Sequence, residues 1–312
     1  MIDLSVEIAG IRMKNPVMPA SGTFGYGEEY SDLVDNSELG ALVSKGTTAI
    51  KWEGNKQPRA WPIFGGMINC IGLQNPGART VVEEKVPYMS QFGVPIIINV
   101  SGKTIEDYVE ATEVLNACPS ISGLEINISC PNIKEGGVTF GQDSVQAAKV
   151  ARAIRKKTKL PLIFKLTPNV TDIVVIARAV VEEGADAISL VNTFKARARM
   201  RSGLYAGQWI EGGQSGAGIM HIALRMVSDL YKAKIGVPII GMGGISSLED
   251  VLDFLESGAD AVQIGTATFI IPSTMTDIIR DLGLYIEQTG CKSLKEWREN
   301  NFPGIPSGPK EK

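Results

Sequence analysis

Polar side chains that follow short apolar runs are the residues in this chain best suited to chemistry. In the stretch 123–137, GLEINISCPNIKEGG, alternating apolar and polar residues predict a strand that ends at Cys130, and Pro131 then stops the ladder. Asparagine is disfavoured inside strands, so we expect Asn127 to face a ligand or a buried hydrogen-bond partner. A buried cysteine followed by a turn would account for the same residues, and the stretch alone leaves both interpretations open.

Similar polar residues end other β-rich runs of the chain. They are Ser21, Lys45, Asn99, Asn127, Cys130, Lys165, Asn192 and Thr193. Any one of them could cap a turn or extend along an apolar surface to water. Their repeated occurrence at strand ends instead indicates one shared binding site.

Two glycine-containing loops suggest a place for an anion. Gly243 and Gly244 precede Ile245 and Ser246, and the pair Gly265 and Thr266 ends the last β-rich run. Bare backbone N–H groups at helix starts bind phosphate, and barrels commonly hold one after strands seven and eight. The two loops therefore predict a phosphorylated ligand or cofactor.

Lys165 stands between Phe164 and Leu166 in a strand that should be buried. A buried ammonium requires an anionic partner or a strong acceptor. Reduced FMN, which carries negative charge near N1, would supply one.

Eight β-rich runs and the amphipathic segments between them must position these groups. The runs are 17–20, 41–48, 95–102, 123–130, 161–168, 187–193, 238–245 and 261–268, and the helical patterns are 104–117, 143–159, 172–183, 219–234 and 247–257. Nearly apolar strands alternating with helices predict a parallel α/β fold, and eight such units predict a closed (β/α)8 barrel. We expect residues 1–312 to form one domain.

Three segments depart from the repeating unit. Residues 6–13 alternate around Ala9 and Gly10, which predicts a β-hairpin before the barrel. The connections 49–94 and 194–217 are too long for simple crossovers, so we expect functional loops there. The tail 302–312, rich in Pro, Gly and Lys, predicts a loose terminus.

Composition narrows the class of protein. The chain has 312 residues, a formal net charge of −3 and a pI near 5.5, which argues against a nucleic-acid or membrane-surface binder. Its four cysteines and one histidine show no metal-binding spacing, so we expect no metal on this chain. The sequence contains neither a secretory signal nor an apolar run near the ~20 residues of a membrane span, which predicts a cytoplasmic protein.

Three further features of the sequence are weaker indicators of function. The sequence GGQSGAG at 212–218 lacks the strand-turn-helix context of a nicotinamide site. Basic residues alternate with small ones over 195–201, and we interpret this alternation as a solvated face that could also touch an anionic substrate or a partner. His221 is expected to pack rather than to act as a base.

Together, these motifs resemble the catalytic subunit of class 1 dihydroorotate dehydrogenases, in particular the NAD-linked 1B branch. The resemblance covers nearly the whole chain, and its most specific parts are NCIGLQNPG at 69–77, INISCPN at 126–132, Phe164 to Leu166, Asn192 with Thr193, and the two glycine loops. Two departures stand out. The segment 194–214 is basic and is not followed by the usual Gly-Pro, and Cys70 occupies a position where alanine is common.

The resemblance implies an FMN-dependent oxidation of dihydroorotate to orotate in pyrimidine biosynthesis. It places FMN against Ser21, Lys45, Gly46, Asn99, Asn127, Lys165, Val191, Gly216, Gly243, Gly244, Gly265 and Thr266. It places the substrate against Lys45, Asn69, Cys70, Ile71, Gly72, Leu73, Asn127, Asn192 and Thr193. It also makes Cys130 the active-site base, with the loop after it as a lid.

The resemblance further implies a partner subunit that carries FAD and a [2Fe–2S] cluster and passes electrons to NAD. Two such pairs would associate through their barrels as a heterotetramer. Three alternatives remain open: a dihydropyrimidine dehydrogenase-like barrel, a fumarate-linked class 1A-like enzyme, and a flavin-binding scaffold without turnover. A neutral pyrimidine lacks the orotate carboxylate that Lys45 could bind, and a scaffold would need no base at Cys130.

Overall fold

Eight parallel strands form the centre of the computed structural model, which describes residues 2–129, 140–201, 203 and 205–302. In chain order they are β3 (Val17–Pro19), β4 (Leu42–Val43), β7 (Ile96–Val100), β8 (Gly123–Asn127), β9 (Leu162–Lys165), β10 (Ala187–Leu190), β13 (Ile239–Met242) and β14 (Ala261–Ile264). From β4 onward each strand pairs in parallel with the next, and β14 pairs with β3.

The barrel is nearly closed between its first two strands. There the N–H of Gly40 donates to the carbonyl of Val17 at 2.8 Å. A Cβ added at Gly40 would lie 2.2 Å from the Asn15 carbonyl oxygen, so only glycine permits this approach. The predicted (β/α)8 barrel is confirmed.

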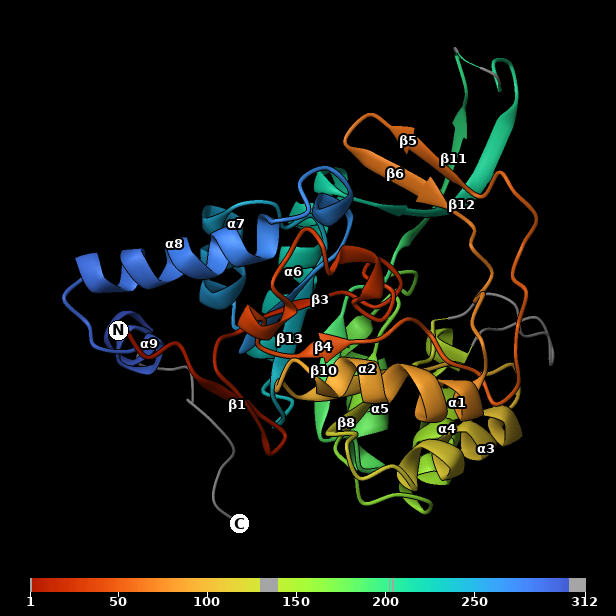
Figure 1. Ribbon diagram of the computed structural model, residues 1–312, viewed down its shortest axis with the longest axis horizontal. Coiled ribbons are helices and arrows are strands. Elements are labelled where there is room, and N and C mark those ends of the chain that lie inside the picture. Colours follow the sequence, from red (N-terminus) through yellow and green to blue (C-terminus); the bar gives the residue numbers. More distant parts are fainter. Residues whose placement is uncertain (1, 130–139, 202, 204, 303–312) are drawn as a thin grey trace.

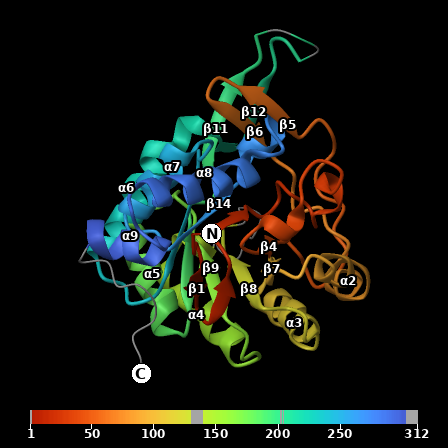
Figure 2. The same cartoon turned by 60° about the vertical axis from the view of Figure 1, so that its left-hand side comes forward.

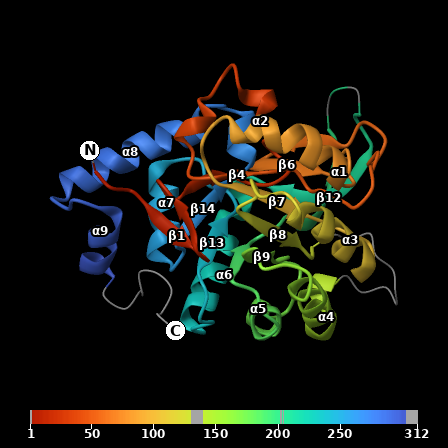
Figure 3. The ribbon, with the colours of Figure 1, turned by 60° about the horizontal axis from the view of Figure 1, so that its bottom comes forward.

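Helices cover the outside of the strands, and Figure 3 shows α3 to α6 following one another around it. They are α1 (Ala78–Thr80), the π-helical turn η3 (Val81–Lys85), α2 (Val86–Ser90), α3 (Ile105–Asn116), α4 (Ser144–Arg155), α5 (Ile173–Glu182), α6 (Met220–Lys232), α7 (Leu248–Glu256), α8 (Thr274–Gln288) and α9 (Leu294–Asn301). Five of them confirm the predicted helical patterns. Short 3-10 turns lie at η1 (Glu28–Tyr30), η2 (Asn36–Glu38), η4 (Phe140–Gln142), η5 (Ala217–Ile219) and η6 (Thr266–Phe269).

Four of the five predicted helices begin at a side-chain cap, and α6 begins without one. Thr104 and Ser247 each accept a hydrogen bond from the backbone of the third helical residue and complete capping boxes. Asp143 and Asp172 cap α4 and α5 in a similar way. These caps explain why helix starts could be located from sequence.

The predicted N-terminal hairpin is also confirmed and consists of β1 (Val6–Ile8) and β2 (Ile11–Met13). It lies at the end of the barrel opposite the protruding β-sheet (Figure 2). Its buried side chains join one apolar cluster with inward residues of the barrel strands. The cluster comprises Ile8, Ile11, Met13, Met18, Ala41, Val43, Ile97, Ile163, Ala187, Ile240 and Ala261. The hairpin therefore seals the lower end of the barrel with apolar surface.

A four-stranded antiparallel sheet rises above the opposite end of the barrel (Figure 1). Its strands are β5 (Ala60–Ile63), β6 (Gly66–Asn69), β11 (Phe194–Arg199) and β12 (Trp209–Ser215), in the order β11-β12-β6-β5. The expectation that 49–94 and 194–217 are loops is therefore wrong in part. Each contributes a hairpin, and the hairpins share a small core of Trp61, Ile68 and Ile210.

Two smaller expectations can be compared with this arrangement. Lys195, Arg197 and Arg199 are exposed on alternate positions of β11, which confirms the predicted solvated face. His221 is exposed on α6, so the expectation that it packs is wrong. In the described part of the chain, no helix is long and apolar enough to cross a membrane.

Candidate active site

A cavity of about 1700 Å³ lies between the carboxyl ends of the barrel strands and the protruding sheet. The predicted site residues of the described chain all line it. They are Ser21, Lys45, Gly46, Asn69, Cys70, Ile71, Gly72, Leu73, Asn99, Asn127, Lys165, Val191, Asn192, Thr193, Gly216, Gly243, Gly244, Gly265 and Thr266. Cys130 lies outside the described residues. Strand topology thus brings together residues that are up to 245 positions apart in the chain.

Lys165 ends β9 and is only 3% exposed. Its ammonium donates to the Ser21 hydroxyl at 3.0 Å and lies 3.6 Å from a carboxylate oxygen of Glu125. Glu125 is therefore one anionic partner of Lys165, supplied by the protein itself beneath the cavity. The expectation that a reduced cofactor also pairs with Lys165 stays a prediction, and Lys165 does line the cavity.

Glu125 is the main site residue that the sequence reasoning left out. The alternation of β8 placed it on the same face as Asn127, and that signal was sufficient to find it. Its carboxylate accepts hydrogen bonds from Asn99 Nδ2 at 2.7 Å, Gln263 Nε2 at 2.7 Å and Ser189 Oγ at 2.9 Å. A layer of polar side chains therefore fills the upper part of the barrel, at the carboxyl ends of its strands.

Asparagine side chains form one wall of the cavity. Asn127 Oδ1 accepts from Asn192 Nδ2 at 3.3 Å and from the Ser129 N–H at 3.2 Å. Asn169 Nδ2 donates to the Thr193 carbonyl at 3.0 Å, which fixes the chain after β10. Asn127 thus has partly buried hydrogen-bond partners and also lines the cavity, and the predicted contact with a ligand stays a prediction. Because asparagine amides both donate and accept, this wall can form hydrogen bonds with the N–H and carbonyl groups of a planar ligand.

The segment 69–73 faces the site from the protruding sheet. Gly72 and Leu73 both have positive φ angles, of 75° and 59°. Asn75 Nδ2 holds this conformation by donating to the Leu73 carbonyl at 2.7 Å, and Asn55 Nδ2 donates to the Cys70 carbonyl at 2.7 Å. A strained leucine held on both sides is typical of a ligand-binding segment.

Lys45 follows β4 and is half-buried at the cavity wall. Burial lowers the pKa of its ammonium below the ordinary 10.5, and the nearby charge of Arg59 lowers it further, while Glu29 opposes both. Within the part of the chain that the structure describes, no carboxylate lies within ion-pair distance of Lys45. Its charge is thus available to an anionic ligand.

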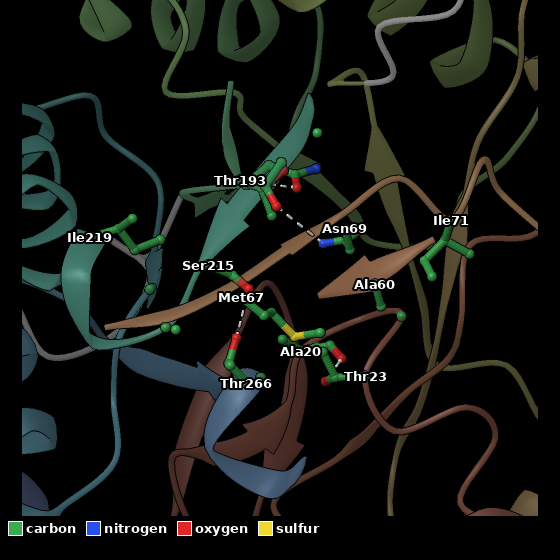
Figure 4. A pocket seen from close by; sticks show the side chains of 18 of the residues that line it. Ala20, Thr23, Ala60, Met67, Asn69, Ile71, Thr193, Ser215, Ile219 and Thr266 are labelled. Atoms are coloured by element: carbon green, nitrogen blue, oxygen red, sulfur yellow. Dashed lines mark hydrogen bonds between the residues drawn. The ribbon is translucent and has the colours of Figure 1, made fainter. Parts of the chain in front are cut away.

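At one end of the cavity, neighbouring segments approach two glycines so closely that a side chain would not fit there. Gly244 has a φ of 87°, and a Cβ there would lie 2.6 Å from the Cβ of Met220. Gly216 has a φ of 100°, and a Cβ there would meet the Cα of Gly66 at 2.5 Å. In Figure 4, Ser215 and Thr266 point toward one another, and their hydroxyls share a hydrogen bond of 2.7 Å. Bare backbone and hydroxyls are the groups that bind phosphate.

Two of the described residues that line the cavity have a buried amide oxygen without a hydrogen-bond partner. The two oxygens are Asn99 Oδ1 and Gln263 Oε1. Buried polar atoms are rarely left unpaired in folded proteins. Together with the Lys165 ammonium, they fit a ligand that brings N–H donors and negative charge to the barrel end.

Comparisons with known proteins agree along nearly the full length. The family model for dihydroorotate dehydrogenase matches residues 3–285. The chain is 48% identical to the dihydroorotate dehydrogenase B (NAD(+)) catalytic subunits of Alkaliphilus metalliredigens and Bacteroides thetaiotaomicron, over 95% of this chain and 98% of each relative. It is also 48% identical to the subunit of the same name from Geotalea daltonii, over 94% of this chain and 96% of that protein.

Proposed function

The chain belongs to the dihydroorotate dehydrogenase family, and we propose that it is the catalytic subunit of an NAD-linked, class 1B enzyme that oxidises dihydroorotate to orotate in pyrimidine biosynthesis. The observation that carries this proposal is the convergence of the predicted cofactor and substrate residues on one cavity of about 1700 Å³. Similarity over 95% of the chain to relatives with this name supports the assignment.

FMN fits the residues that are present. Gly243, Gly244, Gly265 and Thr266 would hold its phosphate, while Lys165 and the orphaned acceptor of Asn99 would lie against its ring. When bound, FMN supplies the acceptor for the hydride that leaves dihydroorotate. The remaining proposed contacts are Ser21, Lys45, Gly46, Asn127, Val191 and Gly216.

The substrate carboxylate would bind Lys45. Because burial disfavours the charged ammonium, a carboxylate beside it restores the interaction that the folded protein lacks. Asn127, Asn192 and Thr193 would orient the pyrimidine ring from one side. From the other side the segment 69–73 would cover it and exclude water.

Proton removal is assigned to Cys130, which lies outside the described residues. Its Sγ would take the proton from C5 of dihydroorotate while the hydride leaves C6. An ordinary thiol has a pKa near ~8.5, so activity should rise toward alkaline pH unless the site lowers that value. The residues that follow Cys130 would act as a lid.

Electron transfer to NAD would require a second subunit. The relatives are named catalytic subunits, which supports a complex with a second subunit. The family resemblance implies that this partner would carry FAD and a [2Fe–2S] cluster. We expect two barrels to associate and each to bind one such partner, in the cytoplasm. The isolated barrel should therefore reduce artificial acceptors, and NAD reduction should appear only when the partner is added.

The absorption spectrum of the purified chain tests the proposal. A yellow protein whose flavin bands bleach on anaerobic addition of dihydroorotate, and not of the neutral analogue dihydrouracil, is expected. Bleaching by dihydrouracil would favour a dihydropyrimidine dehydrogenase-like enzyme. Rapid fumarate reduction by the lone barrel would favour a class 1A-like enzyme, and a colourless chain that takes up no FMN would overturn flavin chemistry altogether.

A further inference from the structure

Glu125 is a carboxylate at the centre of the barrel, and its side chain is fully buried. Its partners come from four other strands of the barrel: Asn99 on β7 and Lys165 on β9, which pair with β8, and Ser189 on β10 and Gln263 on β14, which lie farther around the barrel. Removing a carboxylate from water costs several kcal/mol unless charge and hydrogen bonds compensate. Here each carboxylate oxygen has two polar partners, which together supply three hydrogen bonds and the charge of the Lys165 ammonium.

The carboxylate also dictates how two amides are turned. An ionised Glu125 can only accept, so Asn99 and Gln263 must both direct their NH2 groups toward it. Their carbonyl oxygens consequently face elsewhere and have no partner among the described residues. A Cβ on the cavity residue Gly46 would lie 3.2 Å from Asn99 Oδ1, which places that oxygen toward the cavity side.

Glu125 balances the charge that the cavity receives from Lys165. Lys165 lines the cavity, whereas Glu125 lies beneath it at 3.6 Å from the ammonium. Glu125 is the only carboxylate within 4.0 Å of that ammonium in the described chain. The pair together contributes no net charge to the barrel end.

We propose that Glu125 is a positioning residue that sets the reduction potential of the flavin, by holding and partly neutralising Lys165 and by fixing the orientation of Asn99 and Gln263. This inference rests on the proposed function. Glu125 touches neither FMN nor substrate in the proposed arrangement, because it lies below the residues that line the cavity.

The charge arrangement predicts the sign of the effect. Reduced flavin is anionic, so a nearby cation favours it and a nearby anion disfavours it. Removing the negative charge of Glu125 should therefore raise the midpoint potential, and removing the positive charge of Lys165 should lower it. A purely structural role for Glu125 would give no such pair of opposite shifts.

Potentiometry of three FMN-loaded variants tests this sign. Glu125→Gln keeps the size of the side chain and removes its charge, whereas Lys165→Met removes the cation. Asp260→Asn is the matched control, because Asp260 is also an ion-paired carboxylate, 3.1 Å from Arg298 and 18% exposed, but it lies at the N-terminal end of β14, away from the cavity. Glu125→Gln and Asp260→Asn should both lower the melting temperature of the apoprotein.

Only Glu125→Gln should raise the midpoint potential of the bound FMN. In this variant the affinity for reduced FMN, divided by the affinity for oxidised FMN, should rise about tenfold, near 1.4 kcal/mol. An unchanged or lowered potential would overturn the inference. If Glu125→Gln does not fold, Glu125→Asp should give a smaller rise, and no rise would have the same consequence. A wild-type chain that binds no FMN would instead overturn the proposed function, so the two failures are distinguishable.

Discussion

Two layers of side chains fill the barrel, and the same strands build both. The lower layer is apolar and packs on the N-terminal hairpin, with Ile97, Ile163, Ala187 and Ala261 among its members. Two residues later those strands carry Asn99, Lys165, Ser189 and Gln263. Side chains two apart in a strand face the same side and lie roughly 6.6 Å apart along it. The change from packing to chemistry therefore takes place within one pleat.

The difference separates stability from function. Apolar atoms of the lower layer stabilise the fold simply by leaving water and filling space. Polar atoms of the upper layer lose their hydrogen bonds to water on burial, and hydrogen bonds within the protein, such as those to Glu125, replace them. Two amide oxygens there, on Asn99 and Gln263, have no partner among the described residues and are available to a ligand. Substitutions in the two layers should accordingly affect different measurements.

The largest effect is expected at Cys130, which follows the upper end of β8. Cys130→Ala should keep FMN bound and slow flavin reduction by dihydroorotate about 10²–10⁴-fold, the usual contribution of a positioned acid or base. Anaerobic stopped-flow absorbance measures that rate. Cys118→Ala is the matched control and should reduce its flavin normally. A wild-type rate for Cys130→Ala would assign the proton to another residue.

In the lower layer, Ile163→Ala should act on stability alone. Ile163 is fully buried, so the lost methyl groups and the remaining space should lower the free energy of unfolding by about 2–4 kcal/mol. Chemical denaturation measures this loss, and FMN titration of the folded variant should give the wild-type affinity. Ile222→Ala, at an exposed site on α6, is the control and should change stability by less than about 0.5 kcal/mol. Loss of FMN affinity in folded Ile163→Ala would break the separation between the layers.

Within the upper region, Asn192→Ala should separate substrate from cofactor. Asn192 donates to Asn127 at 3.3 Å on the wall assigned to the pyrimidine. Loss of one hydrogen-bonding group should reduce kcat/KM for dihydroorotate about tenfold, near 1.4 kcal/mol, while FMN stays bound. Steady-state assays with an artificial acceptor measure the first quantity and flavin fluorescence the second. Released FMN would show that Asn192 supports the cofactor instead.

The repeating unit was readable from the sequence because its signals are local. All eight barrel strands and five of the helices followed from apolar runs and capping residues such as Thr104 and Ser247. The residues of the cavity followed from strand ends and from family resemblance. Strand ends alone indicated a shared site but did not distinguish the cofactor half from the substrate half.

The features that sequence missed depend on distant partners. Residues of β12 pair with β6, as in Gly213 with Asn69, and nothing in either segment alone predicts that register. Likewise, the charge partner of Lys165 could not be assigned until the fold placed Glu125 beside it. The pattern located Glu125 on the inward face, but its role emerged only when four other strands surrounded it.

Lys45 gives the smallest expected effect and the sharpest contrast between layers, because here function and stability should oppose one another. The pKa of Lys45 in the folded protein is lowered from 10.5, chiefly by burial. At pH values between the folded pKa of Lys45 and 10.5, the unfolded chain binds more protons than the folded protein, so stability rises with pH. At pH values below the folded pKa, the group is charged in both states, and the buried ammonium destabilises the fold by a constant amount. Lys45→Met should therefore stabilise the apoprotein at pH 7, by less than about 1 kcal/mol because solvent screens the half-exposed group, and this gain should vanish as the pH passes 10.5.

The same variant should bind dihydroorotate more weakly, since the carboxylate loses its cation. Thermal melts of the apoprotein from pH 7 upward measure the first effect, with exposed Lys51→Met as the control, and a lower melting temperature for Lys45→Met at pH 7 would contradict the prediction.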